Sequence, residues 1–265
     1  MYFLSEFNML ILDHLIFEVT RKCTQQCKHC MCGPMQNINI DKKIIDAFFS
    51  QIEYFDHVYI GELFFTGGEP LLNTESINYI LDKISSSVPT IEVNHFGMKT
   101  NGMVYNKKVK NTLYRLYEIS EKKENCWLTC SLDQFHIQPN ESNLKSFGQM
   151  PFFEGTENYK LKKADIMNTG LARKNNLGCP KQGDDFENAK KTIKYIIQQE
   201  EQDEVALKIT QFLDDICINS KGYILTNIDG SYEFQDKYNK GNILIDNIFS
   251  NARQVNLKRA KVKIK

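Results

Sequence analysis

The sequence predicts an α/β protein built on a parallel β-sheet. Its first half alternates short apolar runs, rich in β-branched and aromatic residues, with segments whose apolar residues recur at helical spacing, and turn residues follow each apolar run. Strands that alternate with helices pair in parallel through right-handed crossovers. The 265 residues, 42% of them hydrophobic, are enough for one large domain or for one barrel with a small appendage.

These patterns define the elements of the first half in order. The predicted strands cover residues 14–20, 61–66, 90–100 and 126–132, and the predicted helices cover residues 42–55, 74–84 and 107–122. Asp41 can cap the first helix, in which Ile44, Phe48 and Ile52 recur on one face. Each of the first three strands therefore ends in a loop that leads to a helix.

The second half of the chain is less regular. Residues 142–163 are polar and predict irregular structure, and later segments predict a strand at 165–169, a helix at 185–200 and a strand at 205–212. Residues 216–236 alternate like a hairpin around Asp229-Gly230, a strong turn dipeptide. A weak boundary near Cys179 predicts a core domain of residues 1–178, which at its longest ends near 213, and an extension of residues 179–265.

Charge, hydropathy and cysteine content argue against several kinds of partner. The 33 basic and 33 acidic residues cancel, so no nucleic acid is expected as a partner. No apolar run approaches the ~20 residues that span a bilayer, and the start of the chain lacks the basic region and cleavage site of a signal peptide. Eight cysteines without a secretory signal are typical of a reducing compartment. We therefore expect a cytoplasmic protein with no membrane partner.

The main chemical motif is a cysteine triplet, Cys23-x3-Cys27-x2-Cys30, directly after the first predicted strand. We call residues 20–34 the cysteine loop. Three thiolates can hold three irons of a 4Fe–4S cluster and leave the fourth iron open to another ligand. Two alternatives remain at this point: a zinc site with His29 or Cys32 as fourth ligand, and a disulfide knot of the kind found in small secreted domains.

The other predicted strands also end in unusual residues. The second ends in Gly67-Gly68-Glu69-Pro70, the third in Thr100-Asn101-Gly102, and the fourth in Ser131 and Asp133 on one face, with His136 nearby. Parallel barrels carry their chemistry at these strand ends, and paired glycines let the backbone approach a ligand closely. Ordinary turns and caps are the alternative explanation for each motif taken alone.

The cysteine triplet followed by Gly-Gly-Glu-Pro resembles the radical S-adenosylmethionine (radical SAM) superfamily, over about residues 14–135. The resemblance implies a partial (β/α)6 TIM-like barrel with a small C-terminal α/β extension. It also implies a 4Fe–4S cluster on Cys23, Cys27 and Cys30, whose open iron chelates S-adenosylmethionine. The cofactor contacts that it implies are Gly67, Gly68, Glu69, Thr100, Asn101, Ser131, Asp133 and Arg173.

Some of these assignments are less direct. Arg173 belongs to Gly170-Leu171-Ala172-Arg173, which loosely resembles a Gly-Arg-Ala stretch of the family, with Leu171 in place of the arginine. His136 is a candidate substrate-facing acid or base, because imidazole titrates near neutral pH; a hydrogen-bonded structural histidine is the alternative. His29 is expected to shield the cluster, and Cys32 to be a bystander.

The segment from Cys217 to Asn227 resembles the start of a SPASM or twitch extension, which holds auxiliary clusters in peptide-modifying family members. Asn227 stands where that pattern has a cysteine, and no cysteine follows Cys217, so we expect an extension without metal. The resemblance implies one-electron cleavage of S-adenosylmethionine, driven by an external flavodoxin- or ferredoxin-like donor, and hydrogen abstraction from a peptide. The alternatives are a synthase acting on a nucleotide-like small molecule and a non-catalytic iron–sulfur or zinc sensor.

Overall fold

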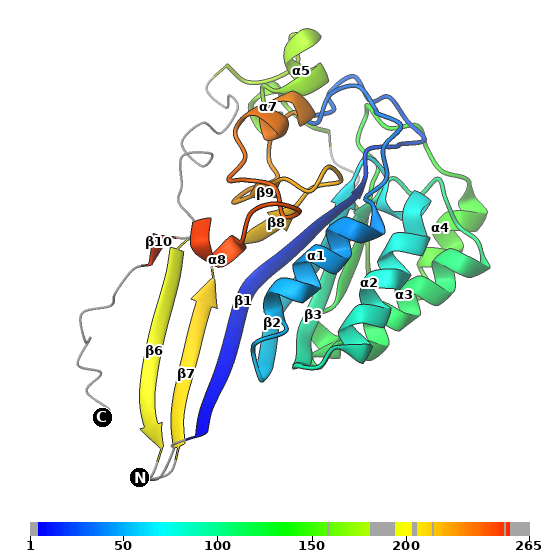
Figure 1. Ribbon diagram of the computed structural model, residues 1–265. Coiled ribbons are helices and arrows are strands. Elements are labelled where there is room, and N and C mark those ends of the chain that lie inside the picture. The colour runs from blue at the N-terminus through cyan, green and yellow to red at the C-terminus, as the bar shows by residue number, and fades with distance from the viewer. Residues whose placement is uncertain are drawn as a thin grey trace, which may run out of the picture.

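The computed structural model describes residues 5–157, 160–180, 194–202, 206–213, 215–251 and 253–254. Five parallel strands form its centre: β1 (Ser5–Thr20), β2 (His57–Gly67), β3 (Thr90–Thr100), β4 (Trp127–Ser131) and β5 (Phe153–Glu157). The helices that connect the first four are α1 (Lys42–Ile52), α2 (Thr74–Ser86) and α3 (Lys107–Ile119). These helices lie side by side along the sheet (Figure 1).

The predicted elements of the first half are confirmed. β1 is longer than predicted and starts at Ser5 rather than at residue 14, because its first half pairs with β2 on one edge and with β7 (Ala206–Leu213) on the other. Asp41 caps α1 as predicted, since its side chain accepts a hydrogen bond of 2.9 Å from the Lys43 N–H. Together with the connecting helices, this arrangement confirms the predicted fold class, a partial barrel with a C-terminal extension.

The core of the fold lies between β1–β4 and the helices. Phe17, on β1, is fully buried and packs edge-to-face on Phe48 of α1, with ring centroids 5.5 Å apart. Phe65, on β2, stacks on the other side of Phe17 at 6.3 Å. Burying a side chain of this size stabilises the fold by roughly 1.5–3 kcal/mol. The core therefore fixes β1 and β2, whose ends carry the cysteine loop and the two glycines.

Two predictions for the middle of the chain are wrong. Residues 142–163 contain a helix, α4 (Glu141–Phe147), and the strand β5 rather than only irregular structure. Residues 165–169 are not a strand, because Gly170 has a φ of +50° and turns the chain into α5 (Gly170–Lys174). Short 3-10 turns complete this region and its neighbours: η1 (Pro70–Asn73), η2 (Lys123–Asn125) and η3 (Lys163–Asp165).

The C-terminal part also differs from the prediction in places. The strand β7 is confirmed, but residues 194–200 belong to a strand, β6 (Lys194–Gln202), because they pair antiparallel with β7 instead of forming a helix. Residues 185–193 of that predicted helix lie outside the described residues. The division of the chain at residue 178 stays a prediction.

The predicted hairpin exists, but its turn lies elsewhere. The two strands are β8 (Ile216–Ile218) and β9 (Ile224–Leu225), and the chain turns between them at Gly222, where the Gly222 N–H donates to Asn219 O at 2.8 Å. The expected turn at Asp229-Gly230 instead leads into α7 (Tyr232–Lys237), which Ser231 caps. Two short elements follow, α8 (Ile248–Asn251) and β10 (Arg253–Gln254). None of the helices in the described part of the chain is long and apolar enough to cross a membrane.

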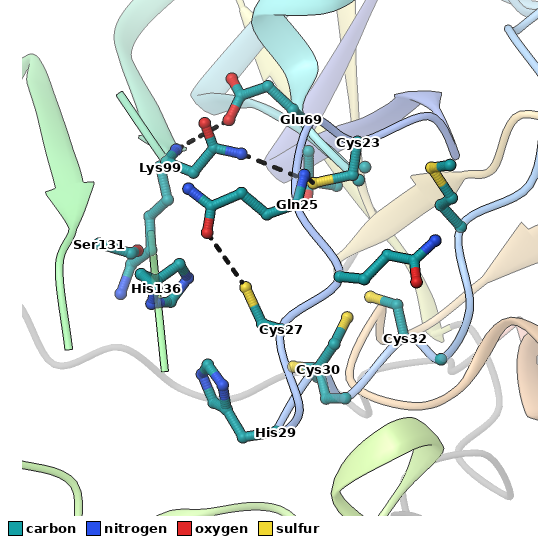
Figure 2. Close-up of a pocket in the computed structure, with 18 of the residues that line it drawn as sticks. Cys23, Gln25, Cys27, His29, Cys30, Cys32, Glu69, Lys99, Ser131 and His136 are labelled. Carbon is teal, nitrogen blue, oxygen red and sulfur yellow. Dashed lines mark hydrogen bonds between the residues drawn. The ribbon is translucent and has the colours of Figure 1, made fainter. Parts of the chain in front are cut away.

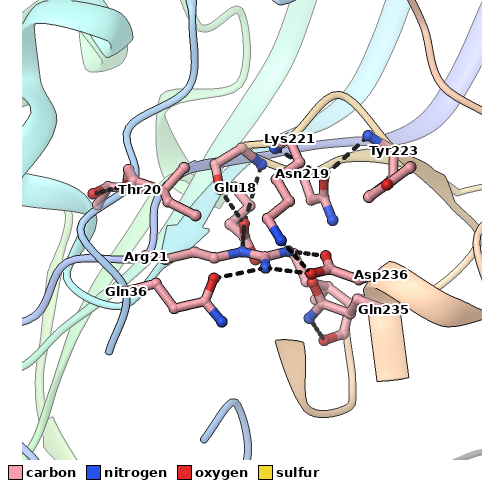
Figure 3. A network of polar contacts seen from close by, with 12 residues as sticks. Glu18, Thr20, Arg21, Gln36, Asn219, Lys221, Tyr223, Gln235 and Asp236 are labelled. Carbon is pink, nitrogen blue, oxygen red and sulfur yellow. Dashed lines mark hydrogen bonds and ion pairs between the residues drawn. The ribbon is translucent and has the colours of Figure 1, made fainter. Parts of the chain in front are cut away.

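A buried ionic network ties the extension to the end of β1 (Figure 3). Arg21 is fully buried; its Nε donates to Glu18 at 2.8 Å and its Nη2 donates to Asp236, on α7, also at 2.8 Å. Glu18 further accepts from the backbone N–H of Ser220 at 3.0 Å and from its hydroxyl at 2.7 Å. Burial raises the pKa of Glu18, while Arg21 opposes this rise. The carboxylate of Glu18 therefore depends on Arg21 to stay charged.

Replacing Arg21 with Met should lower the free energy of unfolding by about 3–5 kcal/mol at pH 7, because it leaves a buried carboxylate without its partner. Chemical denaturation followed by circular dichroism measures this change. Lys221→Met is the matched control: Lys221 also pairs with Asp236, at 2.6 Å, but is 37% exposed, so its loss should cost at most about 1 kcal/mol. If both variants lost the same free energy of unfolding, the buried pairs of Arg21 would contribute no more than the exposed pair of Lys221, and the prediction would be wrong.

Candidate functional site

A cavity of about 470 Å³ opens at the carboxyl ends of β1 to β4 (Figure 2). The cysteine loop forms one wall, and the residues that follow β2, β3 and β4 form the others. Except for Arg173, the strand-end residues expected at a site all line this cavity: Cys23, Cys27, Cys30, Gly67, Gly68, Glu69, Thr100, Asn101, Ser131, Asp133 and His136. The structure thus brings together residues that lie more than a hundred positions apart.

The two glycines after β2 are required by close contact with the cysteine loop. A Cβ atom at Gly67 would lie 2.0 Å from the carbonyl oxygen of Thr20, and one at Gly68 would lie 2.3 Å from that of Lys22. Because the glycines have no Cβ, the two segments lie close enough for the Gly68 N–H to donate to Thr20 O at 2.9 Å and the Glu69 N–H to donate to Lys22 O at 2.8 Å. The glycines therefore let two backbone segments bind each other directly.

Glu69 connects this contact to the end of β3. It is buried, and its carboxylate accepts hydrogen bonds from the Thr100 hydroxyl at 2.8 Å, the Asn101 N–H at 2.7 Å and the Leu71 N–H at 3.1 Å. Burial raises its pKa from 4.5 to about 7, although these hydrogen bonds oppose the rise. With three donors already bound, the carboxylate serves first to position neighbouring strand ends.

Two amide side chains contact the sulfur atoms of Cys23 and Cys27, one from the end of β3 and one from the cysteine loop itself. Asn101 Nδ2 lies 3.5 Å from Cys23 Sγ and 3.0 Å from the Thr24 hydroxyl. Gln25 pairs twice with the backbone of Ile137, donating at 3.0 Å and accepting at 2.9 Å, and its Oε1 also accepts from the Cys27 thiol at 3.4 Å. The loops after β3 and β4 therefore hold the cysteine loop in place.

The donor set fits an iron–sulfur cluster. Burial, together with the neighbouring Cys30 and Cys23, raises the pKa of Cys27 to about 12. By contrast, a hydrogen bond from Cys32 lowers the pKa of Cys30 to about 6. Three thiolates this close together repel one another, so positive charge between them would favour their ionised form, and the iron ions of a cluster would supply that charge.

Two histidines and a carboxylate lie beside the cysteines. Asp133 Oδ2 is 3.3 Å from His29 Nε2 and 3.0 Å from His136 Nδ1. His29 stacks on Phe135 with ring centroids 4.7 Å apart, which fixes its ring next to Cys30. Ser131 lines the same wall. The loop after β4 therefore presents polar groups to the cavity directly beside the cluster motif.

Arg173 is not among the residues that line the cavity, although the resemblance implies that it contacts the cofactor. In α5 the small side chain of Ala172 is buried, and the next residue, Arg173, points outward and is exposed. The segment contacts the cysteine loop through backbone instead: the Leu171 N–H donates to Cys30 O at 2.9 Å and the Thr169 hydroxyl donates to Met31 O at 2.6 Å. α5 thus supports the loop without supplying a charged group.

Sequence reasoning missed several residues that line the cavity. Lys99 stands directly before Thr100, so its place at a strand end was a usable signal. Arg21 and Gln25 lie inside the cysteine loop but belong to no motif. Tyr232 comes from α7, and its N–H donates to Cys32 O at 2.8 Å; its ring lies 4.4 Å from the guanidinium carbon of Arg21. No pattern in the sequence indicates that Tyr232 joins a loop two hundred residues away.

Comparison with known proteins agrees with this geometry. Residues 15–130 match a family model described as a 4Fe-4S single cluster domain. The chain is 28% identical over 105 residues to an uncharacterized protein of Methanocaldococcus jannaschii, covering 40% of this chain and 36% of that protein. It is 31% identical over 101 residues to a GTP 3′,8-cyclase of Clostridium acetobutylicum, covering 38% and 30%. The chain thus spans about a third of the length of the curated relatives it matches.

The fold has solved counterparts. It is similar to BtrN in complex with AdoMet and 2-DOIA, with a TM-score of 0.53 at 15% identity over 91% of this chain and 81% of that chain. It is equally similar to anSMEcpe with bound AdoMet and the Cp18Cys peptide, with a TM-score of 0.53 at 12% identity over 91% and 80%. Together these matches support the radical SAM superfamily that the sequence motifs resemble. The three cysteines of that motif all line the cavity.

The number of clusters is a direct test of the site. After anaerobic reconstitution the chain should hold about four irons, and Cys27→Ser should hold far fewer. Cys126→Ser is the matched control, because Cys126 is buried away from the cavity lining and should leave the iron content unchanged. A content of about eight irons would contradict the expectation that the extension carries no cluster.

Glu69 should make stability depend on pH in the metal-free chain. Its folded-state pKa of about 7 lies above its ordinary value of 4.5, so its contribution is fully present below pH 4.5 and is lost as the pH rises through 7. The free energy of unfolding should therefore fall by about 3 kcal/mol over this range. The free energy of unfolding of Glu69→Gln, measured by denaturation at several pH values, should not show this fall. If its pH dependence is unchanged, other groups cause the fall.

Proposed function

We propose that this chain is a radical SAM enzyme that abstracts a hydrogen atom from a peptide. The observation that supports this most directly is the meeting of Cys23, Cys27 and Cys30 with three other strand ends around one cavity. When bound, a 4Fe–4S cluster with one iron open to S-adenosylmethionine supplies, on one-electron reduction, the 5′-deoxyadenosyl radical that takes the hydrogen atom. The protein's part is to hold, orient and shield these groups.

In this proposal different residues bind the cluster, shape the cavity wall, and face the cofactor and the substrate. The three cysteines bind three irons. Gly67 and Gly68 bring the backbone of the loop after β2 to the cavity wall, and Glu69 positions the end of β3 by binding Thr100 and Asn101. The polar side chains of Asn101, Ser131 and Asp133 face the bound cofactor in this proposal, and His136 serves as an acid or base toward the substrate.

A peptide is the proposed substrate class for two reasons. The segment after Cys217 resembles the start of an extension found in peptide-modifying family members, and one structure of similar fold contains a bound peptide. The absence of any cysteine after Cys217 favours a second candidate, a small molecule, since another structure of similar fold contains 2-DOIA and a related sequence is a GTP 3′,8-cyclase. Finding a precursor peptide encoded beside this chain would favour the first.

Reduction of the cluster needs one electron from outside the chain, so we propose a flavodoxin- or ferredoxin-like donor. We propose the cytoplasm as the location, because the cysteines must stay reduced to bind iron. A non-catalytic sensor is the remaining alternative, and it predicts no turnover of S-adenosylmethionine.

Formation of 5′-deoxyadenosine tests the activity. The reconstituted chain, mixed with S-adenosylmethionine and a strong reductant without oxygen, should form it, while Cys30→Ala should form none because it cannot hold the cluster. Cys126→Ser should match the unmodified chain. If a chain with about four irons forms no product even with candidate peptides and small molecules present, the sensor becomes the better explanation.

A further inference from the structure

A second group of ligand-type side chains lies in the cavity beside the cluster motif. One ligand atom each from His29, Asp133 and His136 lies within 4.8 Å of the other two. We propose that these three side chains bind one divalent transition-metal ion, separate from the iron–sulfur cluster. In this inference Asp133 and His136 are ligands of the ion, in place of the cofactor contact and the acid or base named above. The inference goes beyond the proposed function and does not depend on it, since it concerns binding of an ion and not cleavage of a cofactor.

The distances fit ligands of one ion. Nitrogen and oxygen ligands lie about 2.0–2.2 Å from zinc, so neighbouring ligands in a tetrahedral or octahedral site are about 3.0–3.4 Å apart. Asp133 Oδ2 lies 3.3 Å from His29 Nε2 and 3.0 Å from His136 Nδ1. Both separations match those of neighbouring ligands of one ion, and the ligand atoms of the third pair, His29 and His136, lie within 4.8 Å of each other.

The contact geometry of the His136 ring nitrogen also supports an ion at this position. Its Nδ1 is buried and makes no hydrogen bond within the described chain, although it lies only 3.0 Å from a carboxylate oxygen. When the imidazole is neutral, this close contact without hydrogen-bond alignment leaves both lone pairs free to converge on an ion between them. A buried ring nitrogen without a partner is unfavourable, and an ion would satisfy it.

Asp133 is oriented for this role. Its other oxygen, Oδ1, accepts a hydrogen bond of 2.8 Å from the Phe135 N–H, and its backbone carbonyl accepts one of 3.1 Å from the His136 N–H. These bonds turn Oδ2 toward the two imidazoles, and Asp133 is only 7% exposed. Stacking on Phe135 fixes the ring of His29. Such outer contacts orient metal ligands in known sites.

The donor set selects the kind of ion. Two imidazole nitrogens and one carboxylate oxygen suit zinc or iron(II), whereas magnesium and calcium prefer sites made of oxygen alone. Three protein ligands leave coordination positions open. All three residues line the cavity, where Figure 2 shows His136 near Ser131 and His29 near Cys30. An open position is therefore available to an oxygen or nitrogen donor of a substrate.

Zinc and iron content of the reconstituted full chain tests the site. After incubation with Zn²⁺ and removal of loose metal, the chain should hold one zinc in addition to its iron. Asp133→Asn and His136→Ala should each weaken zinc binding at least tenfold while the iron content stays unchanged. The matched control is His57→Ala, because His57 also lies beside a carboxylate, Glu92 at 3.5 Å, but far from the cavity lining; it should keep its zinc.

X-ray absorption at the zinc edge separates this site from zinc held by cysteines. Nitrogen and oxygen neighbours at about 2.0–2.2 Å would support the proposal, and sulfur neighbours at about 2.3 Å would overturn it. Absence of zinc from the unmodified chain, or zinc retained in both Asp133→Asn and His136→Ala, would also overturn it. None of these results depends on whether the chain cleaves S-adenosylmethionine, so a failure here is distinguishable from a failure of the proposed function.

Discussion

The direct backbone contact between the loop after β2 and the cysteine loop is the constraint on which the site depends. It exists only because Gly67 and Gly68 have no side chain, since a Cβ on either would collide with a carbonyl oxygen of the cysteine loop. Glu69 extends the same contact to β3 through its buried carboxylate. One tetrapeptide thus sets the relative positions of three strand ends before any cofactor is bound, which is the preorganisation that a reactive site requires.

A buried ionic network also holds the start of the cysteine loop in place. Arg21 carries a full positive charge into the interior and is neutralised by Glu18 and Asp236, one from β1 and one from α7. Such a network contributes little net stability compared with apolar packing, but it is intolerant of change, because removing one member leaves another charge buried alone. The extension is therefore part of the scaffold around the cavity even though we expect it to carry no metal.

The sequence allowed the first half of the fold and most of the cavity lining to be predicted, because both depend on local patterns. Strand–helix alternation placed β1 to β4, and strand-end motifs identified the cysteines and Glu69. Several of the failures depend on distant contacts. Residues 194–200 pair with β7 rather than forming a helix, and Tyr232 reaches the cavity only through the path of the extension. Arg173 is not among the residues that line the cavity, and its role as a cofactor contact stays a prediction.

The pairing of β1 has a consequence for how the chain folds. β1 is made first, yet one of its edges pairs with β7 and β8, so Ser5 meets Ala206 and Leu15 meets Ile216. Until those residues leave the ribosome, a long apolar strand presents unpaired backbone groups to other nascent chains. Contacts of such sequence separation form slowly. During synthesis β7 and β8 therefore act as the cover for this edge of β1, and a chain that stops before residue 206 leaves the edge unpaired.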